Sequence, residues 1–263
     1  MEKKSLLMFG FSLLSAMMML YIISMLGLFL NKRPGEELNF NLVFMLQILV
    51  FLSPVAFIST FFKVNFLELI KLKFNLNSKI IIYSIAGLLF LDLMNSSILS
   101  IQDAFAPPFL KEIIDVSISD SQKFYSQLFL INNWYEIFIP IFIGAVLPAI
   151  CEETFFRGLL QTSLSHYSKW TMIMVPSILF GLFHGQIAFL IPQILIGIYL
   201  AILTYYSGSI VPAIIVHFLN NFKAIMMMNI FGIDNQNLDL TLSIILLPVS
   251  IYLLLFVIKL IKN

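Results

Sequence analysis

The chain has 263 residues, of which 60% are hydrophobic and 11% are charged, and its formal net charge is +1. A soluble domain carries about a quarter charged residues, so this composition excludes a soluble globular protein and indicates an integral membrane protein. The small net charge argues against an acidic partner such as nucleic acid. A single cysteine, Cys151, excludes an internal disulfide framework.

Eight apolar segments follow one another along the chain, and a helix that crosses a bilayer needs about 20 such residues. The segments lie at about 5–30, 40–62, 80–100, from 134 through the double glutamate at 152, 171–190, 191–206, 210–230 and 241–261. A basic N-terminus precedes the first segment, but no small-residue cleavage site follows it, so we expect a retained helix. We therefore expect an all-α, polytopic membrane helical bundle that forms one domain, residues 1–263.

The placement of lysine predicts the orientation. The connection between the second and third segments carries four lysines and one acid: Lys63, Lys71, Lys73, Lys79 and Glu68. We expect this connection in the cytoplasm, and with eight segments both termini fall there as well. The longest connection, 101–133, holds more acid than base and is expected outside, with Pro107 and Pro108 breaking any helix in it.

The fourth segment interrupts its apolar run with Glu152, Glu153 and Arg157. Charges at membrane depth are costly, so we expect these three to have a function. Glu153 and Arg157 are four residues apart with the acid first, which is the favourable order for a helical ion pair. Glu152 points about 100° away from Glu153 on a helix. The spacing therefore predicts that Glu153 pairs with Arg157 and that Glu152 is the freer carboxylate.

Two later segments carry further polar residues. His184 lies in the fifth segment, and His217 and Asn221 project from one face of the seventh because they are four residues apart. At about 1.5 Å per residue, Glu152 and His184 lie about 20 Å from the expected cytoplasmic ends of their helices, and the other two about 12–18 Å. We expect all four to converge at one depth.

The chemistry that these groups suit is hydrolysis. A desolvated glutamate can serve as a general base, and a neighbouring histidine can share the water or pass on a proton. A second histidine and an asparagine amide can donate hydrogen bonds to a developing oxyanion. This arrangement requires no metal and no other cofactor.

These residues resemble the motifs of the CPBP family of intramembrane glutamic endopeptidases, which contains CaaX prenyl proteases and bacteriocin-processing (Abi) proteins. The family carries EExxxR, FxxxH and HxxxN on separate helices, and the matching residues here are Glu152-Glu153-x3-Arg157, Phe180-x3-His184 and His217-x3-Asn221. The resemblance covers about residues 145–225. It implies a catalytic core at about 134–230, in a bundle of about eight transmembrane helices with a conical catalytic cavity.

The resemblance also implies an activity, that of a metal-independent endopeptidase that cleaves a peptide bond of a membrane-associated peptide or protein. It assigns a role to each motif residue: water activation to Glu152 and His184, the oxyanion site to His217 and Asn221, and support of the motif helix to Glu153 and Arg157.

Other interpretations stay open. A zinc protease would use Glu152, His184 and His217, but the sequence has no HExxH motif. Cys151 next to the site suggests a thiol nucleophile, although a buried thiol usually stays protonated. A non-catalytic scaffold or bacteriocin-immunity protein would retain the same fold. A transporter fits less well, because the polar residues gather at one site and form no file across the bilayer.

The expected partners are membrane lipid and a hydrophobic or lipidated substrate. Trimming of a prenylated C-terminus, removal of a leader and processing of a signalling peptide all fit the sequence. The abundance of Phe, Ile, Asn and Lys is typical of an AT-rich bacterial genome and favours peptide maturation in a bacterial cell membrane. Two further charges, Asp92 in the third segment and Lys223 in the seventh, are expected to pair or to line the cavity.

Overall fold

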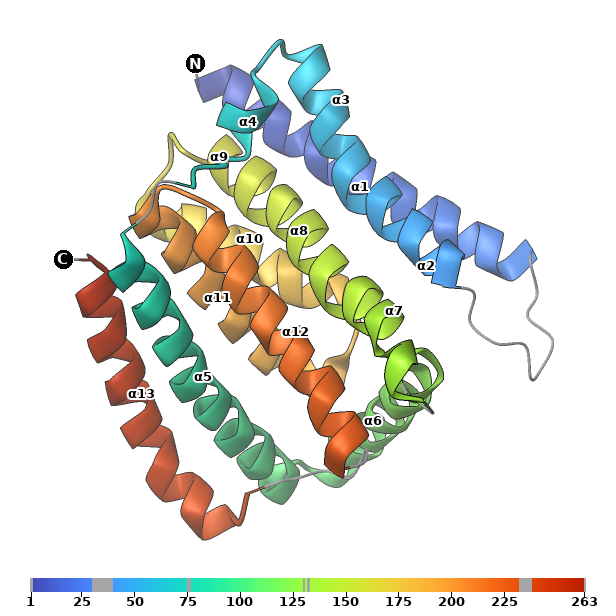
Figure 1. The fold of residues 1–263 in the computed structure, drawn as a ribbon, viewed down its shortest axis with the longest axis vertical. Coiled ribbons are helices and arrows are strands. Elements are labelled where there is room, and N and C mark those ends of the chain that lie inside the picture. Colours follow the sequence, from blue (N-terminus) through green and yellow to red (C-terminus); the bar gives the residue numbers. More distant parts are fainter. Residues whose placement is uncertain are drawn as a thin grey trace.

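The computed structural model describes residues 2–29, 40–74, 77–129, 131, 133–231 and 238–262. Over these residues the secondary structure is helical and includes no strand (Figure 1). Six helical segments are long and apolar enough to cross a membrane: Val43–Phe61, Ser78–Phe105, Phe138–Ser163, Ile187–Ser207, Val211–Ile230 and Leu240–Lys262. The expected all-α, polytopic bundle is confirmed, and the chain is a multi-pass membrane protein.

The helices follow the apolar segments of the sequence closely. The N-terminal half contains α1 (Glu2–Phe29), α2 (Phe40–Gln47), a π-helical turn η1 (Ile48–Leu52), α3 (Ser53–Phe61), α4 (Phe66–Leu69), α5 (Ser78–Phe105) and α6 (Pro108–Phe129). The C-terminal half contains η2 (Trp134–Ile137), α7 (Phe138–Ile141), η3 (Phe142–Val146), α8 (Leu147–Glu153), η4 (Thr154–Leu160), α9 (Gln161–Ser163), α10 (Lys169–Phe183), η5 (Ile187–Phe189), α11 (Leu190–Ser207), α12 (Val211–Phe231) and α13 (Leu240–Lys262). The first and fifth expected segments correspond to α1 and to the shorter apolar helix α10.

The long connection at 101–133 differs from the expectation. Pro107 and Pro108 separate α5 from α6, but they do not exclude a helix, because α6 begins at Pro108 itself. Proline is tolerated in the first turn, where its missing N–H group has no intrahelical acceptor. The prediction that these prolines break any helix in the connection was therefore wrong.

Helix α10 is also shorter than the segment expected at 171–190. It ends at Phe183, and Gly185 follows with a φ of +66°. Glycine adopts this left-handed conformation without a steric penalty, and it commonly terminates helices there. The next residues form the short η5 turn before α11 begins.

One end of the bundle holds the start of α1, the end of α13 and the lysine-rich connection (Figure 1). Hydrogen bonds hold the lysine-rich connection at this end. Lys4 Nζ of α1 donates to the Phe62 carbonyl at 3.0 Å, and the Ser209 hydroxyl, between α11 and α12, donates to the Lys73 carbonyl at 2.7 Å. Both ends of the described chain thus lie on the same side, as an even number of crossings requires. That this side faces the cytoplasm stays a prediction, as do the single domain and the conical cavity.

The helix that bears the glutamates passes through the centre of the bundle. Every residue from Cys151 to Gln161 is buried, and Phe155 and Phe156 pack against Phe51 and Phe183. The segment Thr154–Leu160 is π-helical, so its turn is wider than that of an α-helix. Such turns are frequent at functional sites.

Candidate active site

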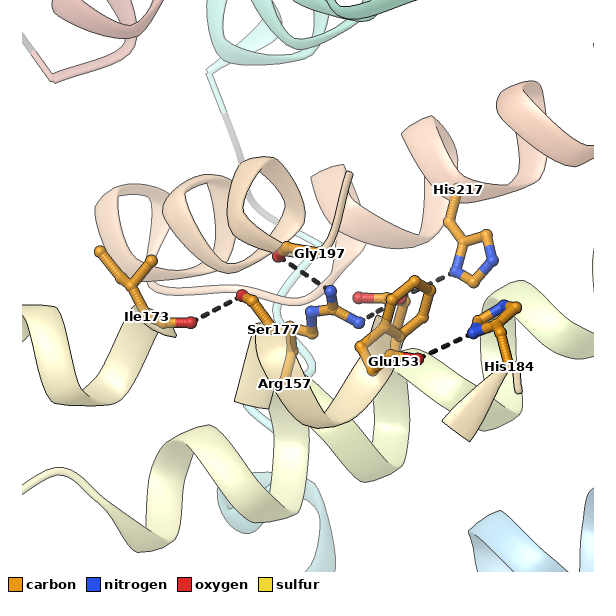
Figure 2. A network of polar contacts seen from close by, with 8 residues as sticks. Glu153, Arg157, Ile173, Ser177, His184, Gly197 and His217 are labelled. Atoms are coloured by element: carbon orange, nitrogen blue, oxygen red, sulfur yellow. Dashed lines mark hydrogen bonds and ion pairs between the residues drawn. The ribbon is translucent and has the colours of Figure 1, made fainter. Parts of the chain in front are cut away.

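The three motifs meet inside the bundle, on α8 and η4, at the end of α10 and on α12 (Figure 2). The ring of Phe180, which is 2% exposed, lies at their junction. Its centroid is 4.7 Å from that of His184, 5.7 Å from that of His217 and 4.6 Å from the guanidinium carbon of Arg157. These contacts bring His184, His217 and Arg157 together around one ring, and the convergence of Glu152 and Asn221 with them stays a prediction.

One oxygen of the Glu153 carboxylate is held by two donors, whereas the other, Oε2, is buried without a hydrogen-bond partner among the described residues. The Oε1 atom accepts a hydrogen bond from Arg157 Nη1 at 2.9 Å and another from His217 Nδ1 at 2.8 Å, and both Glu153 and Arg157 are 0% exposed. The ion pair predicted from the i,i+4 spacing is present. The contact with His217 was not predicted, because 64 residues separate it from Glu153.

Arg157 joins the motif helix to the hairpin of α10 and α11. Its Nη2 atom donates to the Gly197 carbonyl at 2.9 Å, and one turn later Gln161 Nε2 donates to the Ala201 carbonyl at 3.0 Å. The guanidinium also faces the Phe180 ring, a favourable cation–π arrangement away from water. A buried charge with a carboxylate, a carbonyl and an aromatic face around it is well compensated.

Glu152, unlike its neighbour, has no hydrogen-bond donor to its carboxylate among the described residues. It is 9% exposed, and its Oε2 atom is buried without a hydrogen-bond partner among the described residues. Its charge is close enough to act electrostatically on both Arg157 and Tyr125. Buried carboxylate oxygens are rarely left without a donor, so this one is available to a ligand of the site.

Each motif histidine is fixed through its Nδ1 atom. His184 Nδ1 lies 2.8 Å from the Phe180 carbonyl, and His217 Nδ1 lies 2.8 Å from Glu153 Oε1. A carbonyl and a carboxylate only accept hydrogen bonds, so Nδ1 carries a proton in both rings. The Nε2 atoms of both rings then remain for other partners, which is how histidines act in proton transfer.

Asn221 lies one turn beyond His217 on α12 and is half-buried. Its Oδ1 atom accepts a hydrogen bond from Asn220 Nδ2 at 3.3 Å. This orientation leaves the NH₂ group of Asn221 as a donor. An amide donor on the same helical face as His217 is what an oxyanion site requires.

The structure also places the other residues that the sequence singled out. Asp92 Oδ1 and Lys223 Nζ are 2.5 Å apart and connect α5 to α12, so the expected pairing of these charges is present. Cys151 is 0% exposed and its thiol is free. In the part of the chain that the structure describes, no three His, Cys, Asp or Glu side chains are grouped to hold a metal ion, so the zinc-protease alternative finds no ligand set there.

Three polar residues next to the site were missed in the sequence. Tyr125 of α6, Gln186 after His184 and Gln193 of α11 are hydrogen-bonded to one another. Gln186 lies two residues after His184, and this proximity in sequence could have identified it as a neighbour of the site. Tyr125 lies in a connection that was expected to contain no helix, so its sequence position gave no indication.

The fold and the buried Glu–Arg–His arrangement define a multi-pass membrane protein with a polar site inside its helical bundle. Residues 134–223 match the family described as type II CAAX prenyl endopeptidase Rce1-like. This region contains all three motifs, and the match confirms the CPBP family that they indicate. The match supports a CAAX-type intramembrane protease at the level of the family. No curated protein and no solved structure matched the chain.

Proposed function

We propose that this chain is an intramembrane glutamic endopeptidase in which Glu152 and His184 activate the hydrolytic water. The observation that carries the proposal is the difference in hydrogen bonding between the two adjacent glutamates. Each glutamate has a buried Oε2 atom without a partner among the described residues, but Glu153 is fixed through Oε1 by Arg157 and His217 and is 0% exposed. Glu152 has no such partner in the described part of the chain and is 9% exposed, so it is the carboxylate that is freer to bind a water molecule.

In the proposed reaction, Glu152 accepts a proton from water with the assistance of His184 Nε2. The resulting hydroxide attacks the carbonyl carbon of the scissile peptide bond. The NH₂ group of Asn221 donates to the oxyanion that forms. For His217 to donate as well, its ring must carry a second proton, at Nε2, because Nδ1–H is bonded to Glu153. The intermediate then collapses as the proton passes to the leaving amine, which yields a carboxylic acid and an amine.

The proposed substrate is a hydrophobic or lipidated peptide or protein in the bilayer. The family match favours trimming of a prenylated C-terminus. Removal of a leader and processing of a signalling peptide remain among the proposed reactions, because the composition is typical of an AT-rich bacterial genome. We also propose a cell-membrane location with both termini in the cytoplasm, on the evidence of the lysine-rich connection.

Cleavage by purified protein in liposomes tests the proposal. Quenched peptides, one farnesylated at a CAAX-type C-terminus and one carrying a leader, are compared for wild type, Glu152→Ala, His184→Ala and the exposed-acid control Glu68→Gln. We expect chelator-resistant cleavage by wild type and the control, and none by the two site variants.

The other outcomes of this experiment point elsewhere. Chelator-sensitive cleavage would indicate a metalloenzyme, and cleavage that survives both site substitutions would reject the proposed site. A cellular phenotype that is unchanged by Glu152→Ala would instead favour the scaffold or immunity protein.

A further inference from the structure

The segment that follows His184 connects α10 to α11 along the chain, and it is not α-helical. It runs through Gly185, which has a positive φ, to Gln186 and the short η5 turn. Backbone N–H and C=O groups outside regular helices must find partners within the protein when they lie at membrane depth. The partners of this connection therefore influence where α10 ends, and His184 is the residue that directly follows the helix.

Side chains from three helices hold this connection, and we call them the connection clamp: Gln102 of α5, Ser117 and Tyr125 of α6, and Gln193 of α11. Gln102 Nε2 donates to the Ala188 carbonyl at 3.0 Å, and the Ala188 N–H donates to the Ser117 hydroxyl at 3.4 Å. Gln193 Nε2 donates to Gln186 Oε1 at 2.9 Å, and Gln186 Nε2 donates to the Tyr125 hydroxyl at 3.0 Å.

Tyr125 is the member of the clamp that lies next to the catalytic carboxylate. Burial raises the pKa of its hydroxyl, and the charge of Glu152 acts in the same direction, so the hydroxyl stays protonated within electrostatic reach of Glu152. The Tyr125 ring stacks on Phe129 with centroids 5.9 Å apart. The Phe129 carbonyl in turn accepts a hydrogen bond from Asn229 of α12 at 2.9 Å, which fixes this end of α6 against the bundle.

The geometry points to Tyr125 as a positioning residue for His184. The hydroxyl fixes Gln186, and only Gly185 separates Gln186 from His184. Gly185 adopts its φ of +66° without strain but does not itself fix the turn, so the anchor at Gln186 is needed to hold the backbone in this conformation directly after His184. This inference rests on the proposed function for its catalytic consequence, and it makes α6, outside the matched region, a part of the active site.

Tyr125→Phe tests the inference, since it removes only the hydroxyl. Tyr199→Phe is the matched control: the Tyr199 hydroxyl is buried and donates to the Ser84 carbonyl at 2.8 Å, but this bond joins α11 to α5 away from the connection. Hydrogen exchange of the full chain in detergent, read on peptides spanning 184–189, reports the clamp without any substrate. Cleavage of the quenched peptides reports its effect on catalysis.

We expect faster exchange at 184–189 in Tyr125→Phe and wild-type exchange there in Tyr199→Phe. We also expect kcat to fall by about 10- to 100-fold in Tyr125→Phe with KM nearly unchanged, because a small displacement of a reacting group is costly. Unchanged exchange, equal effects of both substitutions, or an altered KM with normal kcat would each overturn the inference.

A wild-type protein that cleaves neither peptide would overturn the proposed function and with it the catalytic consequence of the clamp. The exchange comparison would still decide whether Tyr125 fixes the connection. The two failures are therefore distinguishable.

Discussion

Glu153 Oε1 and His217 Nδ1 lie 2.8 Å apart in the centre of the bundle and join the first motif directly to the third. The same oxygen also accepts from Arg157, so one carboxylate orients a histidine and neutralises a buried guanidinium at once. The second glutamate of the motif is therefore a structural and orienting group. Its neighbour Glu152, which has no hydrogen-bond donor among the described residues, is the carboxylate that we propose for the chemistry.

Glu153→Gln is expected to destabilise the protein by about 3–5 kcal/mol, because it leaves the charge of Arg157 buried without a counter-ion. It should also reduce cleavage strongly, since the carboxylate that fixes His217 Nδ1 becomes a neutral amide, whose oxygen is a weaker acceptor and whose NH₂ group cannot accept. Unfolding in detergent and cleavage of the quenched peptides measure the two effects.

The double variant Glu153→Gln, Arg157→Met separates these two contributions. Removing both charges should restore much of the stability, since an apolar replacement of a buried ion pair is often neutral. Activity should stay low, because His217 still lacks its carboxylate. Recovery of activity together with stability would show that Glu153 acts only through Arg157.

Glu152→Gln is expected to have the opposite profile. No described group donates to its buried Oε2 atom, so the substitution removes little that stabilises the fold. Loss of a general base typically lowers the rate by about 10²–10⁴-fold. We therefore expect an unfolding midpoint at or above that of wild type and a loss of kcat of this size. A clear drop in the midpoint would instead indicate that Glu152 has a structural role.

Gly197→Ala tests the close contact that brings its carbonyl to Arg157. A Cβ atom at this position would lie 3.1 Å from the Ser177 carbonyl oxygen and 3.2 Å from the Ser177 Cα, so α10 and α11 would have to move apart. Overpacking of this kind costs about 1–3 kcal/mol. We expect a lower unfolding midpoint and reduced cleavage, because the guanidinium loses its carbonyl acceptor.

Gly10→Ala is the control for this substitution. Gly10 lies within α1, and nothing lies within 4 Å of a Cβ atom placed there. Replacement of a helical glycine by alanine at an open position stabilises by about 0.5–1 kcal/mol. Opposite shifts of the two unfolding midpoints in the same assay would show that the effect of replacing Gly197 comes from packing and not from the loss of a glycine. Equal shifts would contradict this explanation.

The sequence predicts the parts of this structure that depend on local spacing. The apolar segments locate the helices, and the i,i+4 spacing predicts the pair of Glu153 and Arg157, because one turn of helix brings these residues together regardless of the rest of the fold. The contact between Glu153 and His217 depends on how α8 packs against α12, which the spacing within either helix does not specify.

The missed parts are those in which tertiary contacts override a local signal. The prolines at 107 and 108 correctly mark a break, but α6 starts within it, since its first turn tolerates proline. The early end of α10 depends on Gly185 and on partners from α5, α6 and α11 that satisfy the connection. None of these partners is near in sequence to the residues they hold, except Gln193.

The orientation of the bundle gives a final prediction. The lysine-rich connection and both ends of the described chain lie on one side, and lysine placement predicts that this side is cytoplasmic. The only native cysteine, Cys151, is fully buried, so we expect it not to react with a maleimide. Labelling then reports only the single cysteines that are introduced at exposed sites. In intact cells, a membrane-impermeant maleimide should label Glu112→Cys of α6 and spare Lys79→Cys at the start of α5. Permeabilisation should then expose the second site, because it makes the cytoplasmic face accessible. Labelling of Lys79→Cys before permeabilisation would show that the predicted orientation is inverted.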